Sequence, residues 1–152
     1  QMLPHTACTP RNRARVLHHN DMLKRMVAII EVAEKHGTRW YLENGKDSAL
    51  WKANPILRLS KRKGVTITQF DYCQYGTEYM KPTKVMCWNN PHFGEEAKTC
   101  NFGHHNQWKC TRSGVRHVVL KGKNADGSWK TTATQAYPDQ IADHWAKIIT
   151  RA

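Results

Sequence analysis

Long hydrophobic runs are missing from this 152-residue sequence. No apolar stretch approaches the roughly 18 residues of a membrane-spanning helix, so we expect no membrane contact. The number of cysteines, five, is odd, which excludes a disulfide framework that uses every cysteine. Together with nine histidines, these thiols favour metal binding and a reducing, intracellular compartment over a secreted scaffold.

Acidic residues are also scarce. The sequence has 12 Asp and Glu residues and 24 Lys and Arg residues, which gives a formal charge of +12. This excess favours a polyanionic partner, and nucleic acid, either DNA or RNA, is the usual one. The alternatives are a solvated basic face and a segment docked on other protein chains of a large complex. The cations expected at phosphates are Arg11, Arg13, Arg15, Arg58, Arg62, Lys63, Lys81, Lys109 and Arg112.

The apolar pattern predicts one domain with helices and strands, and six Trp, five Tyr and three Phe supply large side chains for its core. Residues 1–19 are polar and basic, which is typical of a loop. Helices are expected at 21–36, 49–62 and 138–150, and strands at 39–43, 66–73, 83–88 and 116–120. The strand at 39–43 is expected in a parallel sheet, and those at 66–73 and 83–88 form an antiparallel pair.

Residues 89–117 have few apolar side chains and many cysteines and histidines. A loop with so little core of its own is a natural place for a tetrahedral zinc ion. The expected ligands are Cys100, His104, Cys110 and His117, with His105 as an alternative to His104 and Cys87 in reserve. The competing interpretation is a loose basic loop whose thiols are incidental.

Three short stretches carry residues suited to catalysis. The first is Ala7–Arg15, where arginines surround Cys8 and would stabilise its thiolate, although a cysteine near a chain terminus is often inert. The second is Trp40–Gly45, which places Glu43 at the carboxyl end of a strand, as ligand-binding groups are in α/β sheets. Glu43 could equally cap the following turn. The third, Tyr72–Thr83, is a polar loop between two strands.

In this order, the three stretches resemble cytosine-5 DNA methyltransferases, and most closely the divergent methyltransferase-like domains of viral and mobile-element polyproteins. Cys8 matches the nucleophile that attacks the flipped cytosine, and Glu43-Asn44 matches the pair that contacts the base edge. The segment Cys73–Thr83 is nearly identical to the family's Cys-x-Tyr-Gly-x-x-x-x-Lys-Pro-Thr motif. The resemblance implies an α/β fold with a partial Rossmann-like methyltransferase sheet, flanking helices and a Cys/His-rich insertion. The catalytic residues it implies are Cys8, Glu43, Asn44 and Lys81.

The departures from the family fall at its catalytic positions. Ala7 replaces the proline before the nucleophile, Asn12 replaces a serine, and Gly45 replaces the proline of Glu-Asn-Pro. No Phe-x-Gly-x-Gly loop for the methyl donor is found, and its place would lie before residue 1. We therefore expect a single methyltransferase-like domain over 1–152 that lacks the donor-binding segment and binds S-adenosylmethionine only if that half is supplied elsewhere.

These observations favour a non-catalytic, nucleic-acid-associated module of methyltransferase descent. One alternative is the catalytic half of an active cytosine methyltransferase, completed by upstream sequence or another chain. Another is a basic structural component of a ribonucleoprotein or virion.

Overall fold

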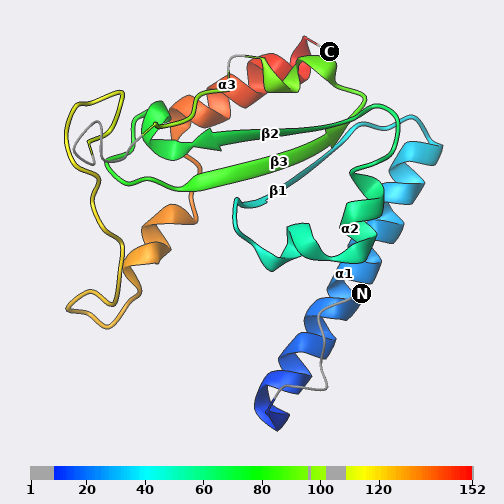
Figure 1. The fold of residues 1–152 in the computed structure, drawn as a ribbon, viewed down its shortest axis with the longest axis horizontal. Coiled ribbons are helices and arrows are strands. Elements are labelled where there is room, and N and C mark those ends of the chain that lie inside the picture. Colours follow the sequence, from blue (N-terminus) through cyan, green and yellow to red (C-terminus); the bar gives the residue numbers. More distant parts are fainter. Residues whose placement is uncertain (1–8, 96, 102–108, 152) are drawn as a thin grey trace.

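A three-stranded antiparallel sheet forms the centre of the computed structural model, which describes residues 9–95, 97–101 and 109–151 (Figure 1). The strands are β1 (Trp40–Gly45), β2 (Val65–Asp71) and β3 (Pro82–Trp88), in the order β1-β3-β2. β3 is antiparallel to both of its neighbours. The fold therefore combines helices with a small sheet, in agreement with the α/β prediction at that general level.

A Rossmann-like sheet is not supported, because neither pair of neighbouring described strands is parallel. The chain passes from β1 to β2 through helical segments, and β3 lies between these two strands. β2 and β3 form a hairpin around the 3-10 helix η2 (Tyr72–Tyr75) and the left-handed Gly76, whose φ is 101°. The other edge of β3 then pairs with β1, with Glu43 opposite Val85.

One face of the sheet is covered by α1 (Pro10–Lys35), the 3-10 helix η1 (Ala49–Lys52) and α2 (Asn54–Leu59). Alternate residues of the strands point to this face, as the period of two in a β-strand requires. The buried residues of this core are Leu23, Ile30, Trp40, Trp51, Ala53, Ile56, Leu59 and Met86.

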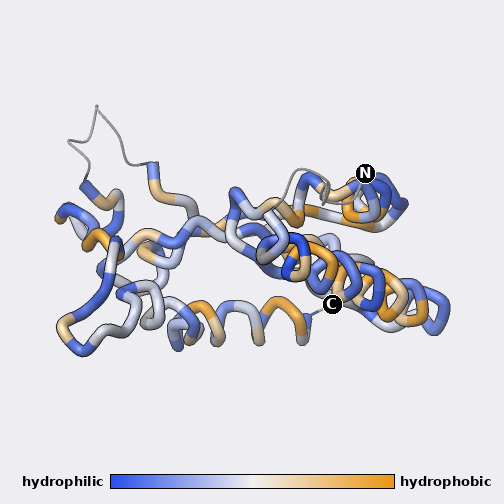
Figure 2. The backbone as a smooth tube through the Cα atoms, turned by 90° about the horizontal axis from the view of Figure 1, so that it is seen from below, coloured by the Kyte–Doolittle hydropathy of each residue, from blue (hydrophilic) through white to orange (hydrophobic). Residues whose placement is uncertain are grey.

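The opposite face packs against η3 (Pro91–Gly94) and α3 (Asp139–Thr150). Ile141 and Ile148 of α3 are buried seven residues apart, on the same side of the helix. Figure 2 shows hydrophobic and hydrophilic positions alternating along α3, which ends beside the C-terminus. The buried residues of this second core are Phe70, Tyr72, Tyr75, Val85, Cys87, Phe93, Ile141 and Ile148.

Helix α1 is longer than the sequence pattern predicts. Residues 10–19 were expected in a loop, but the helix begins at Pro10 and runs for 26 residues to Lys35. Proline is favourable in the first turn because its missing N–H has no partner to lose there, and the arginines, alanine and leucine that follow are good helix formers. Gly37, with a φ of 68°, follows the end of the helix, where glycine is favourable because it adopts the left-handed conformation.

The strand predicted at 116–120 is not formed among the described residues. Arg116 makes only an isolated bridge to Lys109, and Val118 donates its backbone N–H to Glu78 at 2.9 Å. Val119 is 74% exposed, so the apolar run has no core to cover. The segment 109–134, which includes the 3-10 helix η5 (Lys130–Thr134), lies at the end of the molecule remote from α1 (Figure 1).

None of the helices in the described ranges combines the length and the hydrophobicity that crossing a bilayer requires.

Candidate metal centre

Four metal-binding side chains meet between the β2–β3 hairpin and the irregular segment that follows β3. They are Cys73, Cys100, Cys110 and His117, and their ligand atoms all lie within 4.8 Å of one another. The Cys100 Sγ and the His117 Nε2 are 3.7 Å apart. Zinc bonds of about 2.0–2.3 Å place tetrahedral ligand atoms about 3.4–3.8 Å apart. The cluster could therefore hold a metal ion after small side-chain movements.

The sheet positions two of the ligands. Cys73 lies in η2, directly after β2, and is fully buried. The buried carboxylate of Asp71, the last residue of β2, accepts the backbone N–H of Cys100 at 2.6 Å, and the Asp71 N–H donates to Lys98 at 3.1 Å. These bonds hold Cys100 beside the end of β2.

A tight loop supplies the other two ligands. The Cys110 N–H donates to Val115 and the Gly114 N–H donates back to Cys110, both at 2.8 Å. Gly114 has a φ of 72°, a left-handed conformation that glycine adopts at little cost. The Lys109–Arg116 bridge closes the loop and brings His117 back to the thiols.

Polar groups surround the sulfur atoms of the cluster. The Gln74 side-chain amide lies 3.6 Å from the Cys73 Sγ and 3.7 Å from the Cys110 Sγ. The backbone N–H and the hydroxyl of Thr111 lie 3.5 and 3.6 Å from the Cys100 Sγ. Such outer donors orient metal ligands and spread the negative charge that they carry.

The pKa values within the cluster diverge for physical reasons. Burial, together with the like charge of the neighbouring Cys100, raises the pKa of the Cys73 thiol to about 12. Burial also opposes ionisation of Cys110, but backbone hydrogen bonds from Ser113 and Arg112 outweigh it and lower its pKa to about 6. A divalent cation would remove the repulsion between thiolates and let all three ionise.

The structure brings together three of the four predicted ligands: Cys100, Cys110 and His117. The fourth, His104, and its alternative, His105, lie outside the described residues. Cys87 is buried on the α3 side of the sheet, where its thiol lies 3.0 Å from the Thr66 hydroxyl. Cys73 was missed as a ligand, because it is 27 positions before Cys100 and no spacing rule connects the two.

Of the predicted catalytic residues, Cys8 lies outside the described residues. Glu43 accepts a hydrogen bond from the Tyr137 hydroxyl at 2.9 Å, and its other carboxylate oxygen, Oε1, is buried without a described partner. Asn44 accepts the backbone N–H of Gly45 at 2.8 Å. Both residues line a mainly apolar cavity of about 610 Å³ between α1 and β1.

Lys81, the last of the predicted catalytic residues, has an ammonium group that is already bound by other residues of the chain. Its ammonium donates to the Tyr72 hydroxyl at 3.2 Å and to the Thr134 carbonyl at 3.0 Å, and it lies 4.4 Å from the centre of the Tyr72 ring. Burial and the charge of Glu43 raise the pKa of Tyr72. The structure thus brings both Glu43 and Lys81 near one buried tyrosine, Tyr72.

The cations predicted to contact nucleic acid fall into two groups. Some are bound by other residues of the chain, and others are exposed and have no such partner among the described residues. Arg62 pairs with Glu31 and Glu34, and the Arg112 guanidinium donates to the carbonyls of Cys73 and Thr77. The side chain of Arg11 lies outside the described residues. The cations that are exposed and form neither an ion pair nor a side-chain hydrogen bond with a described residue are Arg13, Arg15, Arg58, Lys63 and Lys109.

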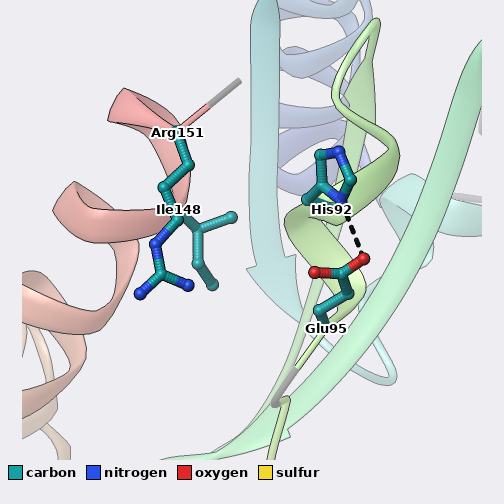
Figure 3. Close-up of a pocket in the computed structure, with 4 residues that line it drawn as sticks. All are labelled: His92, Glu95, Ile148 and Arg151. Atoms are coloured by element: carbon teal, nitrogen blue, oxygen red, sulfur yellow. Dashed lines mark hydrogen bonds and ion pairs between the residues drawn. The ribbon is translucent and has the colours of Figure 1, made fainter.

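A smaller open cavity of about 220 Å³ lies between η3 and the end of α3 (Figure 3). His92 and Glu95 form an ion pair of 2.7 Å on one side, and Ile148 and Arg151 lie on the other. The carboxylate of Glu95 makes this cavity a poor anion site, so we assign it no function.

In comparisons with known proteins, no family model matches the chain, and no curated protein or solved structure matches it with significant similarity.

Proposed function

We propose that the chain is a nucleic-acid-binding module whose basic loop is held in place by a structural zinc ion, and that it does not transfer methyl groups. The observation that carries this proposal is the position of the Cys73, Cys100, Cys110 and His117 cluster. It lies at the base of a loop that exposes Lys109 and Arg116. A closed site with a basic loop attached is suited to binding rather than to catalysis.

Zinc is the proposed metal because of the ligand set. Three thiolates and one imidazole form a common structural zinc site, while calcium and magnesium prefer oxygen ligands. With four protein ligands the coordination sphere is complete, and none is left for a substrate. Among the described residues, the surrounding core consists of cysteines and the partly buried Met80, so the metal would supply most of the stability of this region.

Nucleic acid is the proposed partner because of the charge. The chain carries a formal charge of +12, and five of its predicted phosphate contacts are exposed and form neither an ion pair nor a side-chain hydrogen bond with a described residue. Such cations bind phosphates and release counterions. We also propose that the chain descends from cytosine-5 methyltransferases. This part of the proposal rests only on the match of Cys73–Thr83 to the family's motif.

For residues 1–152 by themselves, the absence of methyl transfer is proposed on two grounds. The sequence contains no Phe-x-Gly-x-Gly loop for the methyl donor. In addition, the ammonium of Lys81 is bound to Tyr72 and Thr134, so it is not directed at a substrate in this conformation.

Metal analysis and binding assays test the two parts separately. We expect about one zinc ion per purified chain, lost in Cys110→Ser and kept in Cys87→Ser, which changes a buried thiol outside the cluster. A zinc content near zero in the unmodified chain would overturn the zinc assignment.

Affinity for a random-sequence duplex should fall steeply with salt, and each phosphate contact should contribute about 0.9 to the log–log slope. Lys109→Ala and Arg116→Ala together should therefore reduce the slope by about 2. A flat salt response would overturn the nucleic-acid proposal.

A second candidate function, the catalytic half of a cytosine methyltransferase, is favoured by the cavity that Glu43 and Asn44 line. Calorimetry with S-adenosylmethionine decides between the two candidates. Micromolar binding by this chain would support the enzyme, and no binding is expected for the module.

A further inference from the structure

A small hairpin at residues 121–130 holds Trp129 in a defined place. Lys123 and Trp129 form an isolated antiparallel bridge. The Asn124 N–H donates to Ser128 at 2.8 Å on one side of this bridge, and the Lys130 N–H donates to Gly122 at 3.1 Å on the other. The position of Trp129 is thus set by backbone hydrogen bonds.

The turn of this hairpin is stabilised by its own side chains. The Asp126 carboxylate accepts the backbone N–H of Ser128 at 2.9 Å and its hydroxyl at 2.6 Å. These hydrogen bonds lower the pKa of Asp126. The one carboxylate of the hairpin is therefore engaged within the turn.

Trp129 contributes little to the core. It is 59% exposed and belongs to none of the three clusters of buried residues, whereas Trp40 and Trp51 are 7% and 8% exposed. The Lys123 ammonium lies 5.1 Å from the centre of one of its rings and occupies one face of the indole. A single exposed apolar side chain is common on protein surfaces, so the groups around this indole decide what it can bind.

The surroundings of Trp129 are positively charged. Lys121, Lys123 and Lys130 lie within the hairpin, and Asp126 is the only acidic residue between positions 118 and 138. An aromatic face beside several lysines matches a ligand that has flat apolar groups and phosphates. In a duplex the faces of the bases are covered by their neighbours, whereas in a single strand they are accessible.

We propose that the 121–130 hairpin binds single-stranded nucleic acid, with Trp129 stacking on an unpaired base and the three lysines contacting phosphates. This inference rests on the proposed nucleic-acid function and specifies its substrate. Lys123 polarises the indole from one face, and the base stacks on the other.

Fluorescence anisotropy with three labelled probes tests the proposal: oligo(dT), a duplex of equal length, and an abasic strand of equal length. Trp129→Ala should weaken binding of oligo(dT) roughly 5- to 100-fold, and Trp129→Phe should retain most of the affinity, because an aromatic ring supplies the stacking energy. Neither variant should change binding of the duplex or the abasic strand. Val119→Ala, at a 74% exposed apolar residue of the same segment, should leave all three affinities unchanged.

The outcomes separate this proposal from the function it rests on. If Trp129→Ala binds oligo(dT) as tightly as the unmodified chain, the stacking proposal is overturned while nucleic-acid binding stands. An equal loss on all three probes would also overturn it, because it would indicate a structural role for Trp129. If the unmodified chain binds none of the probes, both proposals fail.

Discussion

The guanidinium of Arg112 donates a hydrogen bond to the backbone carbonyl of Cys73. It also reaches the carbonyl of Thr77 at 3.5 Å. These contacts connect the loop that carries Cys110 and His117 to the hairpin that carries Cys73. Although Arg112 was predicted as a phosphate contact, its position indicates a role in holding the two halves of the metal centre together.

Arg112→Ala should therefore weaken zinc binding. Loss of a group that orients metal ligands typically reduces affinity about 10- to 100-fold, and competition with a chelator measures the change. Arg116→Ala is the matched control, since Arg116 is exposed in the same loop and its side chain makes no described hydrogen bond. Equal zinc affinity in both variants would contradict the positioning role.

Removal of the proposed zinc ion should loosen the loops that carry its candidate ligands and leave the sheet intact. The two hydrophobic clusters on the faces of the sheet contain none of the four ligands, whereas the third consists of ligand cysteines. After chelation, hydrogen exchange at the Cys100 and Cys110 amides should accelerate, and exchange in β3 should not. Cooperative unfolding of the whole chain on chelation would contradict this prediction.

The sequence predicted those helices and strands that are marked by a pattern of neighbouring residues. The antiparallel pair at 66–73 and 83–88 and the last helix follow from the period of their apolar residues, and the structure has β2, β3 and α3 at these places. The start of α1 was missed because its first turns bury little, so no apolar stripe marks residues 10–19. Helix propensity and Pro10 were the signals available there.

Strand order and the metal ligands depend on contacts between distant residues. The pairing of β1 with β3 joins residues more than 35 positions apart, and no local pattern distinguishes it from a parallel neighbour. Cys73 was interpreted as part of the Cys73–Thr83 motif, and its place among the candidate ligands follows only from the hairpin that puts it beside Cys100. A cysteine at the end of a buried strand was the one signal in the sequence.

Glu34 links α1 to the segment after α2, and its removal should destabilise the fold. Its carboxylate accepts the Trp40 indole N–H at 3.1 Å and pairs with Arg62 at 2.6 Å, with a side chain only 16% exposed. Hydrogen bonds to charged groups contribute about 1.5–3 kcal/mol, so Glu34→Ala should lower the free energy of unfolding by about 2 kcal/mol in urea denaturation.

Asp21→Ala provides the matched control for Glu34→Ala. It removes the Asp21–Arg25 pair of α1, whose side chains are 54% and 78% exposed. Exposed pairs of this spacing contribute only about 0.3–0.5 kcal/mol. If the two variants lose equal stability, the link through Glu34 is not a major contributor to the fold.

The contact between Tyr137 and Glu43 should make the ionisation of this tyrosine sensitive to the carboxylate. Burial, the hydrogen bond to Glu43 and its charge raise the pKa of Tyr137 from 10.0 to about 12. Because the folded pKa is raised, the contact stabilises the fold fully below pH 10, and this contribution is lost as the pH rises through about 12.

Glu43→Gln removes the negative charge, so the pKa of Tyr137 should fall but remain above 10.0, since burial persists. Titration of ring-labelled tyrosines by NMR measures this change, with Glu95→Gln as a remote control. An unchanged Tyr137 pKa in Glu43→Gln would show that the carboxylate does not act on this hydroxyl.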